Sequence, residues 1–159
     1  MQHDAIGRLA RIVCLPLTLA LLPSTAGASL GGRAASIDAD RVQVSGALMR
    51  IVRNDAYALH EIRTASGTSI REYVNATDTV FAVVWDGPWV PDLRQVLGEH
   101  FERYQAAMQA RQRSRTARGA FVIEEPGFVV QMSGHPRAFT GRAYLPALVP
   151  AGVEIASIR

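Results

Sequence analysis

The stretch IREYVNATDTVFAVVWDGPWVPDLRQVLGEHFERYQAAM, residues Ile70–Met108, decides the fold of this chain. It opens with a strand-like run and turns through Asn75–Asp78. It then enters Val80–Trp85, a continuous apolar run that is typical of a strand buried on both faces. The residues Asp86–Pro88 end that strand. Strong strand and helix signals stand side by side only here, so we expect the fold to form around this stretch.

The second half of the stretch predicts a long amphipathic helix. Asp92 places a negative charge near the positive end of its dipole. One apolar stripe recurs at helical spacing and comprises Leu93, Val96, Leu97, Phe101, Tyr104 and Met108. We expect this stripe to pack on the sheet face to which Phe81, Val83 and Trp85 point. Gly98 is the weak point of the helix.

Hairpin signals lie on both sides of this stretch. The strand-like runs are Tyr57–Thr64 and Thr68–Val74 around Ser66-Gly67, Ala120–Ile123 and Phe128–Met132 around Glu125-Pro126-Gly127, and a last strand within Arg137–Leu145. Hairpins joined by a single crossing helix predict the α+β class. We therefore expect a mainly antiparallel sheet built from hairpins, with one long amphipathic helix packed on it.

The first 28 residues have the pattern of a secretory signal peptide. A basic region with Arg8 and Arg11 precedes the short apolar run Ile12–Leu22, and Ala26-Gly27-Ala28 supplies small residues for cleavage before Ser29. The apolar run is too short to cross a bilayer. These features predict an exported protein, periplasmic or extracellular after cleavage near Ala28/Ser29, with no transmembrane helix in the mature chain.

The remaining residues divide into three parts. We expect residues 29–56 to be a flexible lead-in with a short helix that ends near Arg53, residues 57–145 to be a single α+β domain, and residues 146–159 to be an extended C-terminal tail. Cys14 lies in the signal peptide and is the chain's one cysteine. Disulfides, a thiol nucleophile and Cys-ligated metals are therefore excluded from the mature chain.

Charge gives little indication of a partner. All 17 basic residues are arginine, and they exceed the 14 acidic residues by only three. This excess is too small to predict a nucleic-acid-binding protein. Every basic side chain nevertheless carries a planar guanidinium group, which can bind carboxylates or phosphates and stack on aromatic rings.

Several motifs resemble a known family. REYV, VFAVVWDGP, PDLRQVLGEHF, SGHPRAFTGRAYLP and LVPAGV occur in this order between residues 71 and 153. In combination they are similar to a family of small secreted bacterial proteins catalogued as domain of unknown function number 2844. The resemblance implies export and a stand-alone domain, and it implies no activity or functional residues.

Two clusters are candidate ligand-binding sites. The corner after the buried strand contains Trp85, Asp86, Trp89 and Asp92, which could stack a sugar or peptide ring and bind its polar groups. Alternatively, these residues serve the core, the turn and the helix dipole. The second candidate comprises His135, Arg137 and Arg142, which could hold an anion or simply form a solvent-facing turn and strand.

A third candidate is an arginine-rich run after the helix, where we expect the helix to fray. Arg111, Arg113, Arg115 and Arg118 could contact an anionic membrane surface or an acidic partner, or could form a solvated loop. No histidine pair has the spacing of a zinc motif, and no nucleophile motif is present. We therefore predict no metal, no cofactor and no catalytic residues.

These observations favour a non-catalytic module that binds or helps to assemble a component of the cell envelope. Its partner would be an envelope component or another exported protein, with peripheral membrane contact as an option and no nucleic acid. One alternative is a small periplasmic hydrolase or transferase that uses Asp86 or Asp92 with His135 or His100. The other is a structural or stress-related envelope component without a small ligand.

Overall fold

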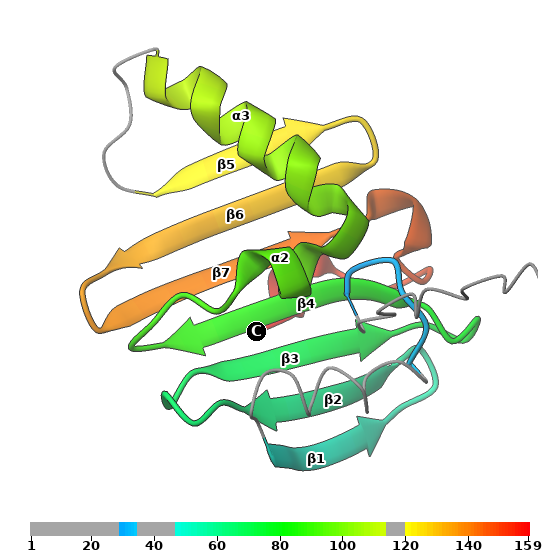
Figure 1. Ribbon diagram of the computed structural model, residues 1–159. Helices are drawn as coiled ribbons and strands as arrows, with labels where there is room; N and C mark the ends of the chain where they lie inside the picture. The colour runs from blue at the N-terminus through cyan, green and yellow to red at the C-terminus, as the bar shows by residue number, and fades with distance from the viewer. Residues whose placement is uncertain (1–28, 35–46, 114–119) are drawn as a thin grey trace, which may run out of the picture.

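The protein is built on one antiparallel sheet. The computed structural model describes residues 29–34, 47–113 and 120–159. Within these ranges the strands form a seven-stranded sheet in the order β1-β2-β3-β4-β7-β6-β5 (Figure 1). The strands are β1 (Ala47–Arg53), β2 (Ala58–Arg63), β3 (Ser69–Val74), β4 (Val80–Gly87), β5 (Phe121–Glu125), β6 (Phe128–His135) and β7 (Ala138–Tyr144). The predicted α+β class is confirmed, and both predicted hairpins, β2–β3 and β5–β6, are present.

A helical layer covers one face of the sheet (Figure 1). It consists of α2 (Leu93–Leu97), the 3-10 turn η2 (Gly98–His100) and α3 (Phe101–Arg113). The predicted helix is therefore present, but it is interrupted at Gly98 and extends past Met108. Gly98 has a φ of +52°, which ends α2 and restarts the helix in a new direction.

The core between helix and sheet is apolar and closed. Trp85, Leu97 and Phe128 are fully buried and belong to one cluster that joins β4, α2 and β6. Leu93, Phe101, Tyr104 and Met108 of the predicted stripe pack against this cluster. The stripe therefore has the predicted role, and it contacts Val83 and Trp85 on the same side of the sheet.

The expected direction of Phe81 was wrong. Phe81 is buried in a second cluster on the opposite face, with Tyr73 and Val84. The cause is a register shift in the β3–β4 pair, where Tyr73 pairs with Ala82 but Val74 pairs with Val80. An extra residue in β4 reverses the alternation of side chains at that point. The run Val80–Trp85 is apolar at every position, so its sequence does not indicate where the alternation of side chains changes.

The N-terminal residues that the structure describes are tied into the fold. Leu30 is only 1% exposed, and its N–H donates to the Val96 carbonyl. The Gly31 N–H donates to the Val80 carbonyl at 2.8 Å. Residues 29–34 therefore connect the sheet with the helical layer instead of forming the expected flexible lead-in. Residues 1–28, which were predicted to be a signal peptide, and residues 35–46 lie outside the described residues.

The helix expected to end near Arg53 is also wrong for its described part. Residues Ala47–Arg53 form β1, which pairs antiparallel with β2. Local spacing of Leu48, Ile51 and Val52 fits a helix, but pairing with a neighbouring strand determines the structure.

The C-terminal residues cover part of the face that lacks the helix. They form the 3-10 turns η3 (Pro146–Leu148) and η4 (Ile155–Ser157) instead of an extended tail. Ile158 is buried against Tyr73, Phe81 and Val84. The Tyr73 hydroxyl donates to the main-chain oxygen of Arg159 at 2.8 Å. This segment covers β3 and β4 and leaves the β5–β6–β7 end of the same face open.

Candidate functional site

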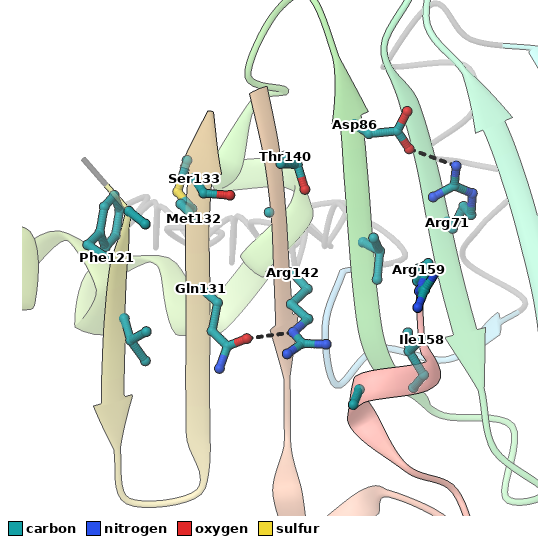
Figure 2. Close-up of a pocket in the computed structure, with 15 residues that line it drawn as sticks. Arg71, Asp86, Phe121, Gln131, Met132, Ser133, Thr140, Arg142, Ile158 and Arg159 are labelled. Atoms are coloured by element: carbon teal, nitrogen blue, oxygen red, sulfur yellow. Dashed lines mark hydrogen bonds and ion pairs between the residues drawn. The ribbon is translucent and has the colours of Figure 1, made fainter. Parts of the chain in front are cut away.

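An open trough of about 730 Å³ lies on the sheet face opposite the helices. Its floor is formed by β4, β7 and β6, and its sides by the C-terminal segment and β5 (Figure 2). We call this surface the trough. Its polar lining consists of Arg71, Asp86, Gln131, Ser133, Thr140, Arg142 and Arg159. The volume lies within the usual range of small-ligand sites.

Strand alternation brings these side chains to one face. Thr140 and Arg142 are two residues apart in β7, and Gln131 pairs with Arg142 across the β6–β7 ladder. The intervening Gly141 lies against the indole of Trp85 on the helical side. The residues of the trough therefore alternate with residues of the core.

Arg71 and Asp86 form an ion pair at one side of the trough. The Nη2 atom of Arg71 lies 2.7 Å from Oδ1 of Asp86 (Figure 2). The Nε atom of Arg71 lies 3.4 Å from Oε1 of Glu61. The Asp86 side chain is 51% exposed and the Arg71 side chain 22%. Arg71 is thus held in place by two carboxylates, while the Asp86 side chain stays half exposed.

Arg142 is fixed in the floor of the trough. Its Nε donates to Oε1 of Gln131 at 2.6 Å, and its Nη1 donates to the Ile155 carbonyl at 2.7 Å. A guanidinium has five N–H donors, so these two bonds leave others that can meet a ligand. A positioned guanidinium with remaining donors is suited to bind a carboxylate or phosphate in bidentate geometry.

The predicted corner residues separate in the structure. Trp85 is fully buried on the helical face, and Asp92 caps α2 by accepting from the Arg94 N–H at 2.9 Å. Trp89 is 61% exposed, and its carbonyl accepts from the Thr68 hydroxyl. Of the four corner candidates, only Asp86 lines the trough.

The second predicted cluster also divides. Arg142 lies in the trough, whereas His135 and Arg137 lie at the exposed β6–β7 turn. The Nδ1 atom of His135 lies 3.2 Å from the Pro136 carbonyl. Arg137 borders a second hollow of about 450 Å³, which Arg63, Asp86 and Thr140 also line. We call this surface the second hollow.

His100 lies on the other side of the sheet from Asp86. Its ring stacks on Phe128 with centroids 5.1 Å apart, within the helical layer. Burial lowers the pKa of His100, and the nearby Glu99 partly opposes this effect. Asp92 is used as a helix cap. Two of the four pairings that the hydrolase alternative allowed, those of His100 with Asp86 or Asp92, therefore receive no support from the geometry.

The arginine-rich run is only partly described. The helix continues through Arg113, and the guanidinium of Arg111 lies 5.2 Å from the ring centroid of Phe121. Arg115 and Arg118 lie outside the described residues. Across the described ranges, no three His, Cys, Asp or Glu side chains are grouped so that they could hold a metal ion. None of the helices in those ranges is long and apolar enough to span a membrane.

Sequence reasoning missed five of the seven polar residues that line the trough. Arg71, Gln131, Ser133, Thr140 and Arg159 come from four separate segments, and only the strand order brings them together. The alternations Q-M-S at residues 131–133 and T-G-R at residues 140–142 were available signals, because each places two polar side chains on one face of a strand.

One family model matches nearly the whole chain. The family is described as "Protein of unknown function (DUF2844)", and the match covers residues 26–158. The chain belongs to this family, as its motifs had indicated. No curated protein and no solved structure matches it.

Proposed function

We propose that this member of the DUF2844 family is an exported, non-catalytic module that binds an anionic component of the cell envelope in the trough. The trough itself carries the proposal. It combines a fixed guanidinium, Arg142, with hydroxyl and amide groups and with apolar patches on an open sheet face. This composition suits reversible binding of a partly polar, negatively charged ligand.

Export is supported by the sequence of residues 1–28, with its basic start, apolar run and small residues before Ser29. Leu30 is buried in the core, so a mature chain that begins at Ser29 keeps the residues that the fold needs. The measurement is the N-terminal sequence of protein recovered from the periplasm or medium. A chain that retains residues 1–28 in the cytoplasm would contradict export.

The binding test uses protein that starts at Ser29 and an immobilised polycarboxylate, polygalacturonate, with uncharged agarose as reference. Ser133→Glu adds a negative charge at an exposed position of the trough and removes no side-chain hydrogen bond to another described residue. We expect wild-type protein to be retained and to elute with salt, and Ser133→Glu to elute earlier.

A matched variant separates local binding from overall charge. Arg50→Glu changes an exposed residue of β1, at the far edge of the sheet from the trough. We expect it to elute much closer to wild type than Ser133→Glu does, although it changes the net charge by more. Absence of retention, or a larger effect of Arg50→Glu, would overturn the proposal. Deletion strains rescued fully by Ser133→Glu would favour a structural envelope component without a ligand.

A further inference from the structure

The trough and the second hollow are neighbouring parts of one face. Asp86 and Thr140 line both of them, so the two depressions meet at these residues. The trough extends from there towards Arg142, and the second hollow extends towards Arg137 and Arg63. The surface is therefore a continuous groove that crosses the ends of β4 and β7.

The groove is longer than one small ligand. Along β7 alone, Ala138 lines the second hollow and Arg142 lines the trough, four residues apart. A strand rises about 3.4 Å per residue, so these positions are about 14 Å apart. A single sugar ring or a free anion would occupy only part of this length.

Positive charge is distributed along the groove. Four arginines of the sheet and its turns line it, namely Arg63 and Arg137 in the second hollow and Arg71 and Arg142 in the trough. The carboxylates that oppose them are Asp86 in the lining and Glu61 beside Arg71. Arg71 is compensated by these two acids, whereas Arg63, Arg137 and Arg142 have no ion pair within the described residues.

From this spacing we infer that the ligand is an acidic polysaccharide chain that spans both depressions. This inference rests on the proposed function and names its ligand class. Carboxylates of successive sugar units meet the separated guanidinium groups, while Ser133, Thr140 and Gln131 offer hydroxyl and amide groups to the ring hydroxyls. The pattern of charge and neutral polar groups distinguishes such a chain from a densely charged phosphate polymer.

The test is a chain-length series of oligogalacturonates, from monomer to hexamer, measured by isothermal titration calorimetry on protein that starts at Ser29. We expect the hexamer to bind at least about tenfold more tightly than the dimer, because its second contact is intramolecular. Maltohexaose, a neutral chain of the same length, should bind far more weakly.

Arg137→Asn isolates the contribution of the second hollow. Arg137 has a φ of +71°, a conformation that Asn tolerates well, and it is exposed. We expect this variant to lose about fivefold or more of hexamer affinity while it keeps the affinity of wild type for the dimer. Arg50→Asn removes the same charge from β1 and should leave both affinities unchanged.

The outcomes separate the inference from the proposed function. Equal affinities for dimer and hexamer, with no effect of Arg137→Asn, would overturn the spanning chain but leave anion binding in the trough intact. Absence of binding for every oligomer would overturn both. Tighter binding of polyphosphate than of the hexamer, or binding to anionic vesicles alone, would overturn the acidic polysaccharide as ligand.

Discussion

Gly141 faces the indole of Trp85 across the β4–β7 pair, and Gly141→Ala tests this contact. A Cβ atom at position 141 would come within 2.5 Å of Cε2 and 2.9 Å of Nε1 of the ring. Trp85 is fully buried, and β7 lies between β4 and β6 in the sheet, so neither partner can move away easily. The methyl group must therefore displace a packed ring.

The expected cost is large and has a definite sign. Overpacking of this kind costs about 3 kcal/mol, towards the upper end of its usual range. For a domain of this size that corresponds to a fall of about 10 °C in Tm. Without the contact, Ala would stabilise the strand by about 0.5–1 kcal/mol relative to Gly. The two cases differ in sign, so the result is unambiguous.

The assay is urea and thermal unfolding followed by far-UV circular dichroism, because this signal remains available in variants that lack Trp85. Trp85→Phe is the second mutation of a double-mutant cycle with Gly141→Ala. It replaces the indole with a smaller ring and removes an indole N–H that is buried without a hydrogen bond among the described residues. Gly141→Ala should cost clearly less when combined with Trp85→Phe. A neutral or stabilising Gly141→Ala would refute the packing of Trp85 on Gly141.

Three further predictions concern the helical layer. Leu30→Ala should cost about 2–4 kcal/mol of unfolding free energy in urea titration, because Leu30 is fully buried, and a cost below about 1 kcal/mol would show that residues 29–34 do not hold the fold. Gly98→Ala should lower Tm, since Gly98 has a positive φ and its Cβ would meet Ser29; an unchanged Tm would contradict this approach. Burial lowers the pKa of His100, so the unfolded chain binds its proton more tightly, and stability should fall as pH drops below about 6.5. His100→Phe should flatten that fall, and an equal slope in both proteins would refute it.

Sequence patterns were sufficient for the elements with strong local signals. The buried strand, the stripe from Leu93 to Met108 and the turns at Ser66-Gly67 and Pro126-Gly127 each depend on neighbours within a few residues. Long-range partners decided the rest. Pairing with β2 made residues 47–53 a strand, and a bulge beside Val80 turned Phe81 to the other face. Neither partner can be read from local spacing.

The candidate site illustrates the same limit. Sequence reasoning grouped Asp86 with Trp85, Trp89 and Asp92 because they are adjacent in the chain. The structure uses strand alternation to bury Trp85 on the helical face and to bring Asp86 to the opposite face with Arg71 and Arg142. Trp85 and Asp86 are adjacent in the sequence, but successive side chains of a strand point to opposite faces of the sheet.

The proposed binding face can be tested directly. The measurement is a titration of ¹⁵N-labelled protein, starting at Ser29, with the galacturonate hexamer, followed by backbone amide shifts. Binding in the groove predicts the largest shifts at Gln131, Ser133, Thr140 and Arg142 and little change along α3. Shifts confined to α2, α3 and the exposed loop around Trp89 would contradict the assignment of the helix-free face as the binding surface.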